Sequence, residues 1–228
     1  MTTFFLNMYE DNFLPSSDPV FLPALNRSLY IAEGSATIET ARAAQFLPTG
    51  TAWLDDQMAT VTTGRSELRL LRWELELREQ KNRELTTFPN VKSVQKLSSP
   101  IELDEEFEWL LRCDSVSFPT GGIAYTHVHQ GPGIRCVLNG SFRIETEGST
   151  HHYQTDDAWL ETGYSPVTAF SSETMPSSFV RCFILPANCK GRSSVRYVNE
   201  HDWNRPKPQT YHIFGERIMA LRGATAER

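Results

Sequence analysis

The sequence predicts an all-β protein made of two similar small barrels in tandem. The 228 residues allow one large domain or two domains of about 100 residues each. Short apolar runs alternate with polar residues and are broken by Gly, Pro, Asn or Ser pairs, as in strands joined by turns. Aromatic residues, which suit pleated surfaces, are plentiful at 13 Phe, 7 Tyr and 5 Trp. An internal repeat indicates the duplication.

The repeat consists of two separate matches at one spacing. Gly-Ser-Ala-Thr-Ile-Glu-Thr at residues 34–40 matches Gly-Ser-Phe-Arg-Ile-Glu-Thr at residues 140–146, which lies 106 positions later. Ala-Trp-Leu at residues 52–54 returns at residues 158–160 with the same offset of 106. Two coincident offsets are hard to obtain by chance and indicate a repeated structural unit.

The repeat sets the expected limits of the two barrels. We expect an N-terminal barrel over residues 1–95 and a C-terminal barrel over residues 96–228, with a polar linker at Gln80–Pro100. Residues 66–78 alternate like a strand but also fit an amphipathic helix, and their β-rich neighbours favour the strand. Residues 104–111 are expected to hold a helical turn before the second barrel.

Charge and composition exclude several classes of function. The net charge of −6 gives no basic footprint for nucleic acid, and we interpret the one cationic cluster, Lys190, Arg192 and Arg196, as solvated surface. The apolar runs fall far short of the ~20 residues that a membrane span needs. The first residues have no cationic start and only a short apolar patch, so a signal peptide is not expected. Neither a nucleophile elbow nor a phosphate loop nor a dinucleotide fingerprint occurs, so no nucleotide cofactor is expected.

The cysteines indicate a reducing compartment. Their spacing contains no Cys-x-x-Cys pair, which argues against a zinc knuckle. Two of them, Cys136 and Cys182, lie in apolar runs and are interpreted as small buried hydrophobes. We therefore expect free thiols and a cytoplasmic location. The four positions are Cys113, Cys136, Cys182 and Cys189.

One stretch carries the residues that can do chemistry. It runs from Gly121 to Gly140 and contains Tyr125, His127 and His129 at alternate positions. Residues two apart in a strand point to the same face, so these three side chains are expected to share one. Two adjacent imidazoles on the inner wall of a barrel can chelate one divalent cation.

This stretch resembles the first motif of the cupin superfamily: a Gly, then His-x-His, a short turn, usually a Glu, and a closing Gly. Residues 156–167 resemble the second motif, and the likeness extends over residues 25–186. It implies two tandem cupin barrels, each a jelly roll or double-stranded β-helix. It also implies that His127 and His129 are metal ligands, with Fe, Mn, Ni or Zn as candidate ions.

The sequence departs from the cupin pattern at two ligand positions. The usual Glu falls at Gly133, and the later His falls at Val167. In the first half, the His pair corresponds to residues 21–23 and the Glu to Arg27, so that barrel is expected to hold no metal. The groups that can complete the site of the second barrel are Glu161, Tyr125, Gln130, His151, His152 and His212.

Four residues are predicted to bind substrate: Tyr125, Arg135, Trp159 and Glu161. Arg135 shares strand parity with the usual Glu, so it is expected to face inward and to pair with a substrate carboxylate or phosphate, or with an internal Glu such as Glu161. Trp53 and Trp159 occupy equivalent repeat positions, which favours core packing over ligand stacking. Glu161 remains open as a ligand, a general base or a solvent-facing residue. Neither His212 nor the His151–His152 pair, expected in an exposed turn, is given a role.

Three functional hypotheses remain. The first is a metal enzyme that acts on a small oxygen-rich organic acid. The cupin resemblance implies dioxygenase, isomerase, lyase or decarboxylase chemistry, and the sequence assigns no catalytic residue. The second is a metal-free module that binds or senses a small molecule. The third is a scaffold that has lost both sites. The resemblance also implies a homodimer that exchanges terminal segments, for which residues 4–14 and a C-terminal arm, residues 213–221, are suited. This arm is expected to pack on a barrel or on a partner subunit.

Overall fold

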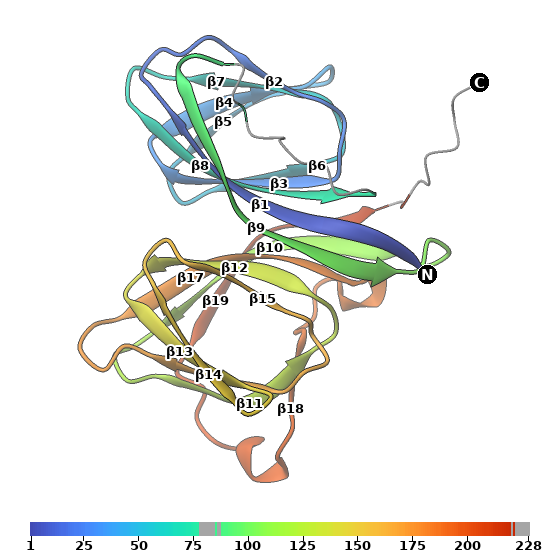
Figure 1. Ribbon diagram of the computed structural model, residues 1–228, viewed down its shortest axis with the longest axis vertical. Helices are drawn as coiled ribbons and strands as arrows, with labels where there is room; N and C mark the ends of the chain where they lie inside the picture. Colours follow the sequence, from blue (N-terminus) through green and yellow to red (C-terminus); the bar gives the residue numbers. More distant parts are fainter. Residues whose placement is uncertain (78–84, 86–87, 220, 222–228) are drawn as a thin grey trace. The chain divides into compact units, whose positions relative to one another are not determined.

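The chain divides into two β-units. The computed structural model (Figure 1) describes residues 1–77, 85, 88–219 and 221. One unit comprises Met1–Phe107 with the described residues from Met219 onward, and the other comprises Glu108–Ile218. Helix in the described residues is limited to two short 3₁₀ turns, η1 (Ala187–Cys189) and η2 (Glu200–Asp202). The predicted all-β class is confirmed.

The first unit is a pair of antiparallel sheets. Its strands are β1 (Thr2–Phe13), β2 (Val20–Leu22), β3 (Arg27–Glu33), β4 (Ser35–Glu39), β5 (Ala44–Pro48), β6 (Ala52–Asp55), β7 (Ala59–Thr63), β8 (Leu68–Glu76) and β9 (Val91–Leu103). Over the described residues, one sheet has the order β6-β3-β8-β1-β9 and the other β2-β7-β4-β5.

The second unit repeats this arrangement. Its strands are β10 (Trp109–Phe118), β11 (Ile123–His129), β12 (Gly133–Asn139), β13 (Ser141–Thr146), β14 (Ser149–Gln154), β15 (Ala158–Glu161), β16 (Val167–Ser171), β17 (Ser177–Pro186), β18 (Val195–Tyr197) and β19 (Thr210–Met219). One sheet has the order β15-β12-β17-β10-β19 and the other β14-β13-β16-β11-β18. Over the described residues, the strand orders of the two units correspond except for β18, which adds an edge strand beside β11 in the second unit. The predicted tandem duplication is confirmed.

The repeated sequence elements occupy equivalent places. Gly34 follows β3 and Gly140 follows β12, and both have left-handed backbones with φ of +80° and +74°. An added Cβ would lie 2.1 Å from the carbonyl oxygen of Glu67 at Gly34, and 2.3 Å from the Ser177 hydroxyl at Gly140. Each strand connection therefore requires glycine, which explains why the repeat preserves it.

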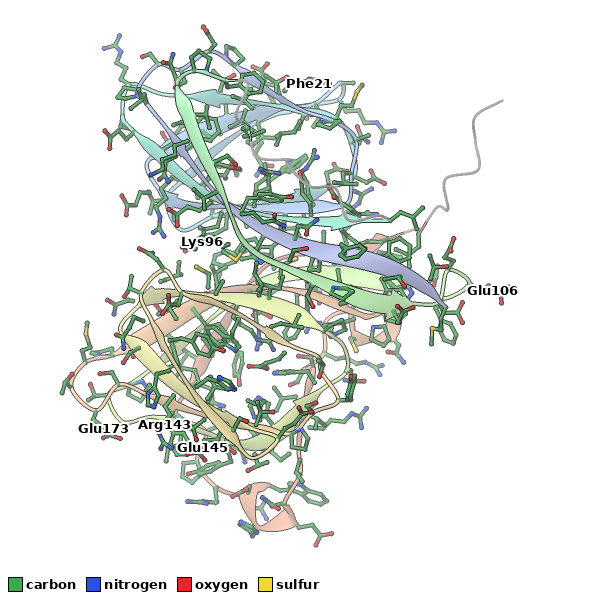
Figure 2. The ribbon with its side chains drawn as sticks, in the orientation of Figure 1. Phe21, Lys96, Glu106, Arg143, Glu145 and Glu173 are labelled. Atoms are coloured by element: carbon green, nitrogen blue, oxygen red, sulfur yellow. The ribbon has the colours of Figure 1, made fainter. Side chains whose placement is uncertain are left out.

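Each unit has its own apolar core between its two sheets (Figure 2). Trp53 belongs to the core of the first unit and Trp159 to the core of the second, in agreement with the core-packing interpretation. The two tryptophans also occupy the same register position: Trp53 is the cross-strand partner of Leu29, and Trp159 that of Arg135. An apolar residue in one copy thus corresponds to an arginine in the other.

The structure corrects two predictions between the barrels. The expected linker at Gln80–Pro100 is wrong over residues 91–100, which lie in β9 and pair with β1; residues 78–84 and 86–87 lie outside the described residues. Polar side chains dominate this stretch, and residues 95–99 are all only partly buried, so the strand has no clear apolar face in the sequence. The proposed boundary between residues 95 and 96 therefore falls within a strand.

The helical turn expected at residues 104–111 is also absent from the described structure. A tight turn occurs instead, in which the Phe107 amide donates to the Asp104 carbonyl, and β10 begins at Trp109. Leu110 and Leu111 are both buried because β10 is covered on both faces. Two consecutive apolar residues do not show the alternation of a half-buried strand, so the sequence of this stretch resembles that of a helix. The alternating run at residues 66–78, by contrast, does form a strand, β8.

The segments expected to act as arms pair within their own sheets. β1, which contains residues 4–13, lies between β8 and β9 rather than at an edge. β19, which includes residues 213–219, adds to the edge of the second unit beside β10. No helix within the described part of the chain has the length and apolar character needed to cross a bilayer.

Candidate functional site

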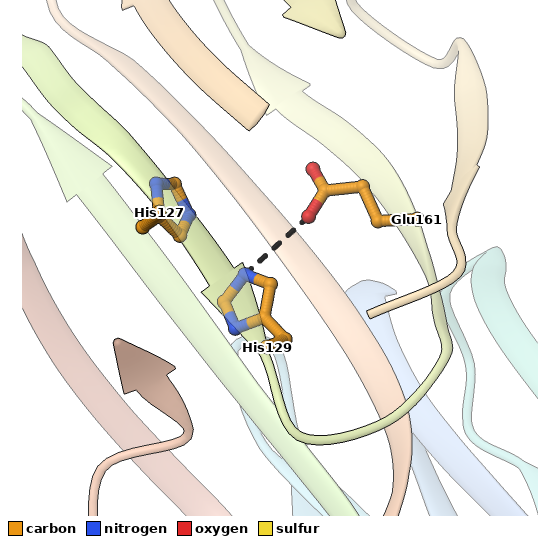
Figure 3. Close-up of side chains that lie close together, drawn as sticks. All are labelled: His127, His129 and Glu161. Carbon is orange, nitrogen blue, oxygen red and sulfur yellow. Dashed lines mark ion pairs between the residues drawn. The ribbon is translucent and has the colours of Figure 1, made fainter. Parts of the chain in front are cut away.

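Two histidines and a glutamate converge inside the second unit (Figure 3). His127 and His129 project from β11, and Glu161 comes from the end of β15. Only 7% of His127 and 5% of His129 is exposed. The two imidazole centroids are 4.9 Å apart, with ring planes at 89°. The potential ligand atoms of the three residues all lie within 4.8 Å of one another.

The histidine pair faces inward because β11 changes register. Ala124 is part of the apolar core, and regular alternation would then turn position 127 outward. The pairing of β11 with β16 shifts between Ala124 and His127, which restores the inward direction. Tyr125 lies within this irregular stretch, and its ring packs under the Arg205 guanidinium at 3.9 Å. The predicted shared face of Tyr125, His127 and His129 required regular alternation along β11. Because the register shifts, the structure does not bring Tyr125 into the group with the histidines.

Arg135 is the cation of this group and is completely buried. Its Nη2 atom lies 2.5 Å from Oε2 of Glu161, and its Nη1 atom donates to the Gly133 carbonyl at 2.5 Å. The guanidinium also packs over the Phe183 ring, 4.7 Å from its centroid. Despite the close approach of charges, neither Nε nor Nη2 has a well-directed hydrogen bond within the described structure. The internal pairing with Glu161, one of the two alternatives for Arg135, is the one observed.

Glu161 contacts three different residues of the site. Its Oε2 atom lies 3.3 Å from Nε2 of His129 as well as close to Arg135, and its Oε1 atom accepts a hydrogen bond from the Trp159 indole at 3.0 Å. This side chain is inward-facing, which removes the solvent-facing reading of Glu161. Trp159 both packs in the core and orients the carboxylate.

The charges of the group follow from burial and pairing. Burial by itself would raise the pKa of Glu161, but the Arg135 guanidinium and the contact with His129 outweigh it, so the pKa lies well below its usual value. Burial lowers the pKa of Arg135 to about 10, which still leaves it charged at neutral pH. Burial also lowers the pKa of His127 and, more strongly, of His129. At neutral pH the site thus holds one carboxylate, one guanidinium and two neutral imidazoles.

The neutral imidazoles are oriented as metal ligands. Nδ1 of His127 lies 2.8 Å from the Tyr125 carbonyl, which can only accept, so the ring proton is on Nδ1 and the lone pair of Nε2 is available. Nδ1 of His129 lies 3.3 Å from the Ser194 hydroxyl, which leaves its Nε2 facing Glu161. Metal–ligand bonds of about 2.0–2.2 Å place tetrahedral ligand atoms roughly 3.5 Å apart. Small side-chain rotations suffice to reach this spacing, so the residues fit a divalent cation.

A pocket of about 150 Å³ reaches this group from one side of the barrel. Tyr153 and Trp159 form part of its wall and are stacked, with centroids 4.9 Å apart and planes at 19°. Glu161 lines the pocket, whereas the two histidines do not. His151 lines it too, on the exposed strand β14 rather than in the expected turn. Of the three clustered residues, Glu161 is therefore the one that borders the pocket.

Sequence reasoning missed three residues around the site: Arg181, Phe183 and Ser194. Phe183 lies between two guanidiniums, with Arg181 4.4 Å and Arg135 4.7 Å from its centroid. Arg181 pairs with Asp114 at 2.6 Å. The signal for Arg181 was a further similarity between the two halves, since Phe-Val-Arg at residues 179–181 resembles Leu-Leu-Arg at residues 70–72. Ser194 lies in a loop and has no such signal.

Comparison with known proteins gives matches by structure but not by sequence. Neither a family model nor a curated protein sequence matches the chain. A deletion variant of Bacillus subtilis oxalate decarboxylase is similar over 88% of this chain and 73% of its own, with 11% identity and a TM-score of 0.63. AerE from Microcystis aeruginosa is similar over 81% of this chain and 88% of its own, with 11% identity and a TM-score of 0.56.

The chain has the cupin-superfamily fold. These levels of identity show the fold alone. The cupin resemblance read from residues 25–186 is therefore confirmed as a statement about architecture, while the chemistry depends on the residues of the second barrel.

Within this cupin barrel, the missing motif glutamate has a steric explanation. A Cβ at Gly133 would lie 2.6 Å from the Phe183 ring and 2.7 Å from the Cys182 carbonyl oxygen, so no side chain fits there. Glu161 is the direct cross-strand partner of Gly133 and supplies a carboxylate from the neighbouring strand. Val167, at the later His position, is buried in the apolar core. Of the six residues that were candidates to complete the site, Glu161 is the one that the pairing of β12 with β15 places beside the histidines.

The equivalent region of the first cupin barrel contains buried ion pairs. Arg27 stands where Gly133 stands in the second barrel and pairs with Glu74 at 3.0 Å. Glu74 also pairs with Arg72 at 2.7 Å, and Arg72 pairs with Asp11 at 2.7 Å. The Glu74 carboxylate is thus held between two arginines, and a guanidinium occupies the position of the usual metal-binding glutamate.

Proposed function

We propose that the second cupin barrel binds a divalent metal through His127, His129 and Glu161 and acts on a small oxygen-rich organic acid there. The observation that carries the proposal is the convergence of three ligand atoms within 4.8 Å inside the barrel, beside a buried arginine. The metal, as Fe, Mn, Ni or Zn, would polarise an oxygen of the acid. Dioxygenase, isomerase, lyase and decarboxylase reactions are all compatible with this arrangement.

The chain's own residues would position the acid. Arg135 carries a permanent positive charge at neutral pH, and its flat guanidinium suits a carboxylate. The stacked rings of Tyr153 and Trp159 form an apolar wall that excludes water from one side of the pocket. Oxalate decarboxylase, by its name, acts on a small dicarboxylic acid, and its similar fold supports this substrate class by analogy only.

A metal-free binding module is the second candidate. One observation favours it: Glu161 already pairs with Arg135 and contacts His129, so the charges of the site are compensated without an ion. In this case the second barrel would bind a small molecule in the pocket lined by Trp159 and Glu161, without turnover.

Elemental analysis separates the two candidates. Protein made without a polyhistidine tag should carry close to one equivalent of metal, and His127→Ala should lose most of it. His212→Ala is the matched control, because His212 is exposed on β19 and packs against Phe214. Absence of metal in the wild type, even after incubation with each of the four ions, would contradict the metal site. Thermal shifts caused by small acids in that same protein would then support the binding module.

Two further predictions accompany the proposal. We propose a cytoplasmic homodimer, and the four cysteines, which are free and buried, are consistent with a reducing compartment. Size-exclusion chromatography with light scattering tests the homodimer.

A further inference from the structure

We infer that Glu161 is shared between Arg135 and the metal, so that the metal and a ligand carboxylate bind cooperatively. When the metal engages Glu161, the carboxylate of the ligand replaces it on Arg135. The inference rests on the proposed metal site. It adds that the bound ion frees the Arg135 guanidinium to bind the carboxylate of the ligand.

The sharing follows from a single oxygen atom. Oε2 of Glu161 lies 2.5 Å from Nη2 of Arg135 and 3.3 Å from Nε2 of His129, while the other oxygen accepts from Trp159. Arg135 and the histidine pair therefore compete for the same carboxylate oxygen. A cation bound between the imidazoles draws this oxygen toward itself, because the charge of a divalent ion exceeds that of a guanidinium.

Arg135 then needs another anion. It is fully buried, and burying a charge without a partner is unfavourable. Nε and Nη2 form one edge of the guanidinium, and both atoms lack a well-directed hydrogen bond in the described structure. This edge matches the two oxygens of a carboxylate. The third nitrogen, Nη1, is already bound to the Gly133 carbonyl and fixes the orientation of the group.

The pocket defines which acid can reach this edge. Glu161 lines the pocket together with Trp159 and Tyr153, so the place that its carboxylate leaves opens toward an apolar wall. The volume of about 150 Å³ admits only a small molecule. The best fit is a short acid with a hydroxyl or oxo oxygen next to its carboxylate, since that oxygen faces the metal while the carboxylate pairs with Arg135.

The coupling is reciprocal. If the metal strengthens binding of the acid, the acid strengthens binding of the metal by the same factor. Without metal, a ligand carboxylate must displace Glu161 from Arg135 and leave a second buried anion nearby, so binding of the acid alone is weak.

Calorimetric titration of Mn²⁺ with and without glycolate tests the inference on the wild-type protein. Glycolate should raise the affinity for Mn²⁺ on the order of tenfold. Glycolamide, its uncharged analogue, should have little effect. Chelation of Mn²⁺ by glycolate in solution would lower the apparent affinity, so it cannot produce the expected result. Mn²⁺ affinity unchanged by glycolate would overturn the inference and leave the metal site intact. If Mn²⁺ does not bind, the same titration is made with Fe²⁺, Ni²⁺ and Zn²⁺. A protein that binds none of the four ions in either condition would overturn both the inference and the proposed metal site.

A variant identifies the residue responsible. Arg135→Met removes the competing cation, so Mn²⁺ should bind at least as tightly as in the wild type and the effect of glycolate should disappear. Arg143→Met is the matched control: Arg143 lies beside Glu145 on β13 of the same barrel, outside the site (Figure 2), and should keep the full glycolate effect. A glycolate effect that persists in folded Arg135→Met would contradict the assignment to Arg135. If this variant does not fold, the wild-type titration still decides.

Discussion

Gly133 and Glu161 are direct cross-strand partners in β12 and β15, and the carboxylate missing at position 133 is present at position 161. No side chain fits at position 133, and the residue opposite provides a carboxylate directed at the histidine pair. The second cupin barrel thus keeps a two-histidine, one-carboxylate set by taking the carboxylate from a neighbouring strand.

The close packing at Gly133 predicts a large cost for any substitution there. In Gly133→Ala, the new Cβ meets the Phe183 ring and the Cys182 carbonyl, so the free energy of unfolding should fall by about 1–3 kcal/mol. Urea denaturation measures this change. Gly64→Ala is the control, because its Cβ would find only an ordinary contact of 3.6 Å with Ser35. Equal stability of the two variants would show that strands β12 and β17 lie further apart than described.

The Glu161–Arg135 pair predicts a strong dependence of stability on both partners. Glu161→Ala leaves the buried guanidinium without its counter-ion and should destabilise the fold by about 3–5 kcal/mol. The double variant Glu161→Ala, Arg135→Met should recover most of this loss. Denaturation of the metal-free protein provides the measurement, with Glu147→Ala at the exposed pocket rim as control. A double variant no more stable than the single variant would argue against the pairing.

The histidine pKa values predict loss of stability in mild acid. Burial lowers the pKa of His127 and His129 below 6.5, the value expected in the unfolded chain. The unfolded state therefore binds these protons first, and stability falls as pH drops below about 6.5, by up to ~1.4 kcal/mol per pH unit for each histidine. Urea denaturation at several pH values, with metal removed, should show this slope. His129→Gln should reduce it, and an unchanged slope would mean that other groups cause it.

The hydrogen bond from Trp159 to Glu161 predicts an effect on metal affinity. Trp159→Phe keeps an aromatic ring in the core but removes the N–H that orients the carboxylate, and such supporting contacts typically contribute about 10–100-fold to affinity. Calorimetric titration with Mn²⁺ measures the loss. Trp53→Phe, the same change at the equivalent position of the first barrel, should leave the affinity unaltered. Equal losses in both variants would indicate a general effect on folding.

Much of the architecture was accessible from the sequence because the duplication preserved specific residues. The glycines at 34 and 140 are required by left-handed backbones, and the tryptophans at 53 and 159 by equivalent core positions. The inward direction of His127 and His129 was also predicted, although by regular alternation from Tyr125, which the structure does not show.

The rest depends on relationships between distant parts of the chain. The register shift in β11 that turns Tyr125 away leaves no mark in the sequence. The role of Glu161 depends on its pairing with β12, which local pattern cannot reveal. Strand β9 was taken for a linker because it pairs with the distant strand β1 while its own residues 95–99 are only partly buried and mostly polar.

The buried ion pairs of the first barrel make single amino-acid substitutions in its interior unfavourable. Replacing Arg27 alone removes one of the two arginines that flank the buried Glu74, and replacing Glu74 alone deprives both arginines of a shared carboxylate. Each single step toward a ligand site is thereby penalised before any gain is possible. In the second barrel, the Glu161–Arg135 pair carries a similar penalty, but its carboxylate already faces a histidine pair, so three ligand atoms are in place without further substitution. The two copies therefore start from different distances to a ligand site.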